Sequence, residues 1–222
     1  MTIATAIKAQ GRVAQRQERN REALVLAGYK VMSKKGIDSA TMQEIAELAD
    51  VGAGTIYSYF KSKDELAIVV LERAMLNLAR RIEAVTDKFE DPAQVYAFGI
   101  RTVIEAATTD LRWKQLLYRS EVIANAMFNA MGPFAIRDLE KATRAGRFKV
   151  ADARMTFNMA AHAIVGISLA ITQNIFNEKD KDEAVVRLLC MTGIGETEAI
   201  ALANRPRPPL PPENAMTSRR LR

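Results

Sequence analysis

Apolar residues recur at three- and four-residue spacing along most of the chain, and this pattern predicts helices. The same segments are rich in Ala, Leu, Glu, Arg and Met, which favour helix, and the alternation typical of strands is nearly absent. We therefore predict an all-α fold. The expected helices cover residues 12–34, 41–48, 53–59, 62–85, 92–108, 112–129, 133–145, 151–176 and 181–203, with a break in the last at 193–195.

Several helix ends carry their own signals. Gly36 follows the first expected helix, where glycine commonly ends a helix. Ser62 and Glu65 have the spacing of a capping box, and Asp91-Pro92 is typical of a helix start. On the buried face of the first helix we expect Ala23, Leu26, Ala27 and Val31.

The segment 41–60 has the pattern of a helix-turn-helix. Thr41 and Glu44 can form a capping box, and Ala46 is small where two helices must approach closely. The turn centres on Asp50, at a position that needs a left-handed backbone, which Asp tolerates. The expected inner face consists of Ile45, Leu48, Ala49, Val51 and Ile56.

This arrangement leaves the start of the second helix exposed. Its side chains can enter the DNA major groove, and the small residues at 52–54 let the backbone approach phosphates. A chance pair of amphipathic helices is the alternative explanation. It does not account for the cap, the small residue, the turn and the anchor occurring in this order.

Three stretches resemble the N-terminal signature of the TetR family of bacterial regulators. They are Arg21-Glu-Ala-Leu-Val-Leu-Ala-Gly-Tyr, the segment 35–46, and Gly54-Thr-Ile-Tyr-Ser-Tyr-Phe-Lys-Ser-Lys-Asp-Glu-Leu. The resemblance covers about residues 18–66 and implies an N-terminal three-helix helix-turn-helix domain followed by a larger helical regulatory and dimerisation domain. Two positions depart from the family pattern: Asp50 stands where Gly is usual, and Gly52 where Ser or a similar cap is frequent.

The resemblance also implies which residues contact DNA. Backbone phosphates would be bound by Thr41, Thr55, Tyr57, Tyr59 and Lys63, and bases mainly by the segment 52–58. That segment lacks Arg, Asn and Gln, which most often make bidentate base contacts. Arginines before the first helix are therefore further candidates, either on one helical face or as a flexible arm in the minor groove; a solvated face is the alternative. The candidate DNA-binding residues are Thr41, Gly52, Ala53, Gly54, Thr55, Tyr57, Ser58, Tyr59, Lys63, Arg12 and Arg16.

The charge is concentrated at the two ends of the chain. Of the net charge of +6, residues 1–35 contribute eight basic and two acidic side chains, and residues 204–222 five basic and one acidic. A surface that binds a polyanion is therefore expected near the ends. We predict a basic arm with the start of the first helix (1–20), a DNA-binding domain (21–66), an effector-binding and dimerisation domain (67–203) and a disordered Pro/Arg-rich tail (204–222).

The segment 91–176 is rich in aromatic residues and Met, which are common in any helical core. The resemblance implies that this domain also holds a small-molecule cavity, and adaptable Met and large rings suit an apolar or aromatic effector. The candidate pocket residues are Tyr96, Phe98, Trp113, Leu117, Tyr118, Met127, Phe128, Phe134, Met159 and His162. His162, the only histidine, is more typical of a hydrogen-bonded core or interface residue than of a metal ligand.

Small residues in the segment 160–170 form a stripe that permits close helix approach. Packing within the chain would produce the same pattern, but the resemblance implies a homodimer whose four-helix bundle uses the last two helices. The candidate interface residues are Ala163, Gly166, Ile167, Ala170, Val185, Leu188 and Leu189.

Few features suggest an enzyme. Two segments begin like GxGxxG, at Gly52 and Gly193, but both lack the third glycine and a preceding strand. We expect no catalysis, cofactor or metal, since one His and one Cys leave few candidate nucleophiles or ligands. A cytoplasmic protein without a membrane segment is expected, because no uninterrupted apolar run reaches the roughly 18 residues of a membrane span.

The resulting hypothesis is a ligand-responsive transcriptional regulator of TetR type. It would act as a homodimeric repressor on a pseudo-palindromic double-stranded DNA operator, and a small apolar or aromatic effector would release it. The alternative is a helical small-molecule-binding or interaction protein that does not bind DNA.

Overall fold

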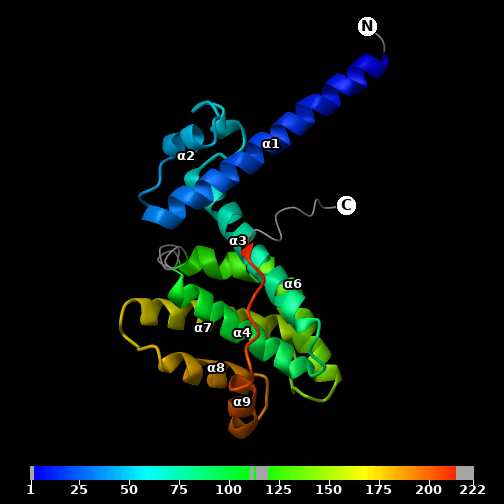
Figure 1. Cartoon of the computed structure of the whole chain (residues 1–222), viewed down its shortest axis with the longest axis vertical. Helices are drawn as coiled ribbons and strands as arrows, with labels where there is room; N and C mark the ends of the chain where they lie inside the picture. The colour runs from blue at the N-terminus through cyan, green and yellow to red at the C-terminus, as the bar shows by residue number, and fades with distance from the viewer. Residues whose placement is uncertain (1–2, 111–112, 114–119, 214–222) are drawn as a thin grey trace. The chain divides into compact units, whose positions relative to one another are not determined.

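The computed structural model describes residues 3–110, 113 and 120–213 (Figure 1). The chain divides into two compact units, Met1–Val70 and Leu71–Arg222. Every regular element in the described stretches is helical, which confirms the predicted all-α fold.

The first unit contains α1 (Ile3–Lys35), α2 (Met42–Leu48), the short 3-10 helix η1 (Ile56–Ser58) and the first turns of α3 (Lys63–Thr86). α1 begins at Ile3, well before the expected start at Arg12. The helix ends just before Gly36, as predicted. Gly36 has a φ of +87°, and its N–H donates to the Met32 carbonyl at 2.8 Å.

α1 approaches α3 closely at Gly28. A Cβ at this position would lie 3.1 Å from Val70 Cγ2 and 3.5 Å from Leu66, so only glycine permits this spacing without adjustment. Leu24 is fully buried on α1, whereas Leu26 is 45% exposed. The predicted burial of Leu26 is therefore wrong, because the close approach at Gly28 turns a different face of α1 toward the core.

The second unit contains the end of α3 and the helices α4 (Pro92–Thr109), α6 (Ser120–Arg144), α7 (Ala153–Thr172), α8 (Asp180–Cys190) and α9 (Glu196–Ala203). α4 is central and packs against α6, α7, α8 and α9. Asp91 begins it as predicted, accepting a hydrogen bond from the N–H of Ala93 at 3.0 Å. The predicted break at 193–195 is also confirmed, since Gly193 between α8 and α9 has a φ of +81°.

α6 is one continuous helix through Pro133, where two separate helices were expected. Proline lacks the N–H of one helical hydrogen bond and commonly ends or kinks a helix. Here Pro133 is exposed, while Ala130 and Met131 just before it are 8% and 6% exposed. The predicted break is wrong because core packing on both sides of the proline outweighs its local preference.

α7 is long and apolar enough to cross a membrane by length and composition alone. In the structure it packs against α6 and α4. Phe157, Ala161 and Ile164 on this side are 5%, 0% and 3% exposed. Burial of one face between neighbouring helices accounts for much of its apolar composition.

The carboxylate of Asp91 joins several parts of the second unit. It accepts hydrogen bonds from Arg147 at 3.0 and 3.1 Å and pairs with Arg205 at 3.0 Å, while Arg147 also contacts Glu198 of α9. Burial acts to raise the pKa of Asp91. The hydrogen bonds from Arg147 and from the Ala93 backbone, with the charges of Arg147 and Arg205, outweigh burial and lower the pKa.

Residues 204–213, here termed the strap, run along α4 toward α3 (Figure 1, red). Arg101 of α4 donates to the Arg205 carbonyl at 2.6 Å, and Arg81 of α3 donates to the Pro211 carbonyl at 2.7 Å. The predicted disorder is wrong for this segment, because its extended backbone leaves carbonyls available to these arginines. Residues 214–222 lie outside the described part of the chain.

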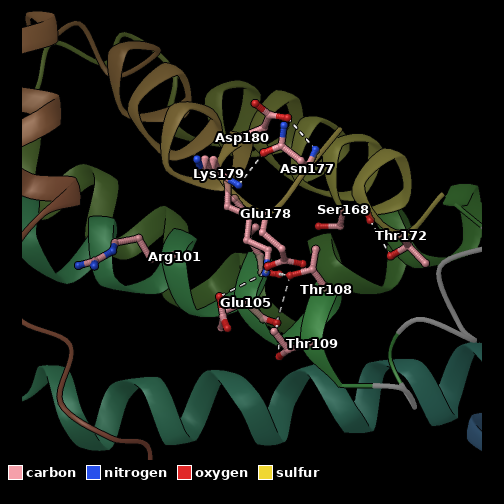
Figure 2. A network of polar contacts seen from close by, with 12 residues as sticks. Arg101, Glu105, Thr108, Thr109, Ser168, Thr172, Asn177, Glu178, Lys179 and Asp180 are labelled. Atoms are coloured by element: carbon pink, nitrogen blue, oxygen red, sulfur yellow. Dashed lines mark hydrogen bonds and ion pairs between the residues drawn. The ribbon is translucent and has the colours of Figure 1, made fainter. Parts of the chain in front are cut away.

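A polar network links α4 to the start of α8 (Figure 2). Lys181 is only 7% exposed, and its ammonium pairs with Glu105 of α4 at 3.6 Å and with Glu178. Glu105 also faces Arg207 of the strap at 3.9 Å. The fully buried Ser168 Oγ of α7 has no hydrogen-bond partner among the described residues. The two carboxylates compensate the burial of a charged lysine in this part of the fold.

Candidate nucleic-acid interface and effector cavity

Side-chain caps begin both helices that flank the turn region. Thr41 Oγ1 accepts a hydrogen bond from the N–H of Glu44 at 3.2 Å, which confirms Thr41 as the cap of α2. Ser62 Oγ accepts from the N–H of Glu65 at 3.1 Å, and the Glu65 carboxylate accepts from the N–H of Lys61 at 2.7 Å. The bonds to Thr41 and Ser62 satisfy backbone donors that the first turn of a helix leaves without partners, and the bond from Lys61 fixes the chain just before α3.

The turn after α2 is a Schellman motif. The N–H of Val51 donates to the Ala46 carbonyl at 2.9 Å, and the N–H of Asp50 to the Glu47 carbonyl at 3.1 Å. Asp50 has a φ of +54°, which confirms the predicted left-handed residue. The chain thus reverses after α2 with the carbonyls of its last turn satisfied.

The two arms of the motif are held together by fully buried anchors. Ile45, Ala46 and Ile56 are all 0% exposed, as the pattern predicts. Leu48 is 54% exposed, so its predicted place on the inner face is wrong. Leu48 lies within the Schellman turn, whose hydrogen bonds run from residues 50 and 51 back to Glu47 and Ala46.

The second helix is shorter than expected. Instead of a helix over 53–59 there is one 3-10 turn at 56–58, preceded by the hydrogen bond from Thr55 N–H to the Gly52 carbonyl at 2.8 Å. Glycines at 52 and 54 disfavour helix by their backbone freedom. Ser58 Oγ also donates to the Thr55 carbonyl at 2.7 Å and competes with helical pairing.

The outer surface of this segment is open. Tyr57 is 56% exposed and Tyr59 is partly exposed. Lys63 lies at the start of α3, where its ammonium donates to the Asp38 carbonyl at 2.6 Å and ties α3 to the loop after α1. The other candidates on this surface are also exposed: Thr41, Gly52, Ala53, Gly54, Thr55 and Ser58.

The basic N-terminal segment is helical from Ile3 onward. Arg16 and Arg19 are exposed on α1, which favours a basic helical face over a flexible arm. The backbone of Arg12 belongs to the same helix, and its side chain lies outside the described residues.

The second unit has an apolar cavity of about 60 Å³, partly open to the surface, between α3, α4, α6 and α7. Three candidate effector residues line it: Tyr96, Met127 and Phe134. The remaining lining residues are Ala79, Ile82, Val95, Gly99, Ile100, Val103, Met131, Ala135, Asp138, Phe157 and Ile164. A search for aromatic rings and methionines misses most of them, because small and branched residues form the wall. The spacing of positions 95, 96, 99, 100 and 103 on one face of α4 is the signal that would have found them.

The other candidate effector residues lie elsewhere. Phe98 packs edge-to-face on Phe89, and Phe128 stacks on Phe157 with 6.0 Å between ring centroids. Trp113 is buried but does not line the cavity. The predicted pocket positions of two α7 residues are not supported, since Met159 is 47% exposed and His162 is exposed, with its Nδ1 2.9 Å from the Asn158 carbonyl oxygen. Leu117 and Tyr118 lie outside the described residues.

Two ionisable groups lie at the cavity wall. Burial raises the pKa of the Tyr96 phenol well above its usual value. Burial, assisted by the negative charge of Glu83, also raises the pKa of Asp138 and outweighs the hydrogen bonds that Arg137 donates to it at 3.0 and 2.9 Å. Arg137 is shared, because it donates to Glu83 of α3 at 2.6 Å. The wall thus offers a phenol donor and a carboxyl group to a bound molecule.

The candidate interface residues divide into two groups. On α7, Ala163 and Gly166 are exposed and Ile167 and Ala170 are partly exposed, so the predicted stripe lies on the surface. On α8, the corresponding predictions are not supported. The protomer's own core holds Val185, Leu188 and Leu189, which are 3%, 4% and 0% exposed.

Two family models match the chain. Residues 24–70 match the model described as "Bacterial regulatory proteins, tetR family", and residues 91–205 match "Tetracyclin repressor-like, C-terminal domain". The second match alone spans more than half of the chain. The chain belongs to the TetR family. The N-terminal match overlaps the segment whose motifs carry the resemblance, and the second extends membership to the helical body.

Relatives of the chain include the HTH-type transcriptional repressor KstR of Mycolicibacterium smegmatis, which is 40% identical over 78 residues, covering 35% of each chain. The HTH-type transcriptional regulator SAB2452 of Staphylococcus aureus is 23% identical over 116 residues, covering 46% of this chain and 63% of the relative. The chain therefore matches about a third of KstR and less than two thirds of SAB2452.

Solved structures extend the similarity over most of the chain. RolR in complex with resorcinol is 27% identical with a TM-score of 0.81, covering 89% of this chain and 100% of RolR. FadR from Bacillus subtilis in complex with stearoyl-CoA is 20% identical with a TM-score of 0.59, covering 78% of this chain and 99% of FadR. The likeness to FadR concerns the fold alone.

Proposed function

We propose that this TetR-family protein is a DNA-binding transcriptional repressor that acts as a homodimer on a pseudo-palindromic operator. The observation that carries the proposal is the exposed surface at 52–59, which stands over the buried anchors Ile45, Ala46 and Ile56. In a dimer, two such surfaces must lie about 34 Å apart to enter successive major grooves.

The residues on this surface suit phosphate binding. Hydroxyl groups of Thr41, Thr55 and Tyr57 can donate to phosphate oxygens, and the Lys63 ammonium adds a positive charge. Base recognition would rest on backbone groups and on apolar contact of the Ala53 methyl with thymine, since the segment has no bidentate reader. The exposed Arg16 and its neighbours on α1 would add to affinity and to the salt dependence of binding.

Footprinting tests the DNA-binding proposal. We expect a protected, salt-sensitive site in the DNA that flanks the protein's own gene, with two half-sites about one helical turn apart. No protection there, together with no enrichment in a random-sequence selection, would refute DNA binding. A helical ligand-binding protein that does not touch DNA would then be the better description.

We infer that the effector is a small aromatic compound that carries a polar group. The cavity of about 60 Å³ is less than half of the roughly 150 Å³ that accommodates benzene in an engineered protein cavity, so binding requires the wall to yield. Met127 and Met131 can repack to make room. Tyr96 and Asp138 can hydrogen-bond a hydroxyl, and RolR, of similar fold, has been solved with resorcinol.

Titration with monocyclic phenols and with benzene tests this inference. A phenol should raise the melting temperature and lower operator affinity, and Asp138→Asn should weaken phenol binding more than benzene binding. If no ring compound changes melting or operator affinity, the body serves only as a dimerisation scaffold. Release from DNA requires that the effector bind the released conformation more tightly than the DNA-binding one. A difference of about 3 kcal/mol in binding free energy changes operator occupancy over a hundredfold.

The homodimer would use the exposed face of α7. Ala163 and Gly166 permit close approach of a second copy, and Met155 and Met159, 57% and 47% exposed, extend the apolar surface. Gly166→Glu should give monomers in sedimentation without unfolding the protein; dimers of unchanged stability would refute this surface. We further propose a DNA-binding domain over 21–66, an effector and dimerisation domain over 67–203, no catalytic role, and a cytoplasmic location.

A further inference from the structure

The strap is fixed to α4 by arginine contacts. Arg205 donates to Gln94 Oε1 at 2.7 Å and pairs with Asp91 at 3.0 Å. Arg207 donates to the Arg101 carbonyl at 3.4 Å, near the Glu105 carboxylate. These contacts extend over most of the length of α4 and hold the strap in register along it.

Beyond α4 the strap reaches α3. The Nε of Arg81 donates to the Pro211 carbonyl at 2.7 Å. Arg81 lies between Ala79 and Ile82, which both line the cavity, and Arg101, the α4 residue bonded to the strap, follows the lining residue Ile100. The strap therefore joins the two helices at the turns that form the cavity wall.

Within the second unit, α3 also makes polar contacts with α6. Glu72 accepts from Asn129 at 3.0 Å, and Glu83 accepts from Arg137 at 2.6 Å. The contact of Arg81 differs from these, because it connects α3 to the strap, which lies along α4. Loss of this contact would remove the hydrogen bond that joins α3 to the strap.

We propose that the strap is a latch that restrains α3 and opposes enlargement of the cavity. This inference rests on the proposed effector function. A ring compound must expand a cavity of about 60 Å³, so any contact that holds α3 in place makes the free energy of binding less favourable. Release of the latch should tighten binding of a ring about 3- to 10-fold, the range expected for one hydrogen bond. The family match ends at residue 205, so most of the strap lies beyond the matched domain.

Four full-length proteins test the latch: wild type, Arg81→Ala, the double variant Arg205→Ala/Arg207→Ala, and the matched control Arg80→Ala. The control removes the same charge from the neighbouring position of α3. Hydrogen–deuterium exchange without ligand should be faster over 75–84 in the first two variants than in wild type and the control. Benzene, followed by its shift of the melting temperature, should bind 3- to 10-fold more tightly to the same two variants.

Unchanged exchange in both latch variants would overturn the proposal, as would equal benzene affinity in all four proteins. A double variant that unfolds is replaced by Arg81→Gln, which leaves the strap's own contacts to α4 in place and must show the same two effects. If benzene and phenols bind none of the proteins, the effector function fails, while the exchange data still decide whether the strap restrains α3.

Discussion

Gly99→Ala tests the cavity directly. Gly99 lines the cavity from the middle of α4, and a Cβ there would meet no atom within 4 Å. Glycine in a helix interior costs about 0.5–1 kcal/mol relative to alanine, and the added methyl makes no contact that would add to this gain. The variant should therefore be more stable by about 0.5–1 kcal/mol. For a chain of this size, that corresponds to a rise in melting temperature of roughly 1–4 °C.

The same methyl should impair effector binding. A ring already has to enlarge the cavity of about 60 Å³, and an added group forces further displacement at about 1–3 kcal/mol, or 5- to 150-fold in affinity. Urea unfolding and calorimetric titration with a phenol measure the two effects, and operator affinity without ligand serves as the control. A destabilised variant, or a stabilised one that binds phenol as wild type does, would show that Gly99 does not border a usable cavity.

Further substitutions address DNA binding, pH dependence and the turn. Tyr57→Ala and Lys63→Ala should weaken binding to all DNA sites alike while the dimer survives in sedimentation; monomers would contradict a role confined to phosphate contact. The lowered pKa of Asp91 means that its stabilising effect is present above pH 3.8 and lost as the pH falls through the lower folded-state pKa. Asp91→Asn should therefore lower the free energy of unfolding at pH 7 and flatten its acid dependence in urea titrations. The raised pKa of Tyr96 predicts a second pH effect, at alkaline pH. The free energy of unfolding should fall as the pH rises past 10, and Tyr96→Phe should remove this fall. Asp50→Gly should raise the free energy of unfolding by about 0.5–1 kcal/mol, since φ is +54°, whereas Asp50→Asn should change it little.

Much of the fold follows from local signals in the sequence. Thr41, Gly36, Asp50 and Asp91 act at the positions where capping and turn chemistry place them, because each interaction involves residues a few positions apart. Where the structure differs from the prediction, the cause is a contact between residues far apart in the sequence. α6 continues through Pro133 because of packing by other helices, and the strap is ordered by arginines of α3 and α4.

The site was predictable to a similar degree. The exposed surface at 52–59 follows from the spacing of its anchors, although its two glycines shortened the helix to a single 3-10 turn. The cavity depends on how four helices meet, which periodicity does not specify. Asp138 in particular lines it because α6 rotates that position inward, and no local pattern marks an acidic residue for such a place.

The separation of anchors from exposed positions at 52–54 has an evolutionary consequence. Ala53 is exposed, and a Cβ on Gly54 would meet nothing within 4 Å. Mutations that introduce longer side chains at these two positions would thus leave the core of the first unit intact. Lineages carrying this scaffold can acquire a new operator preference one substitution at a time, without passing through unstable intermediates.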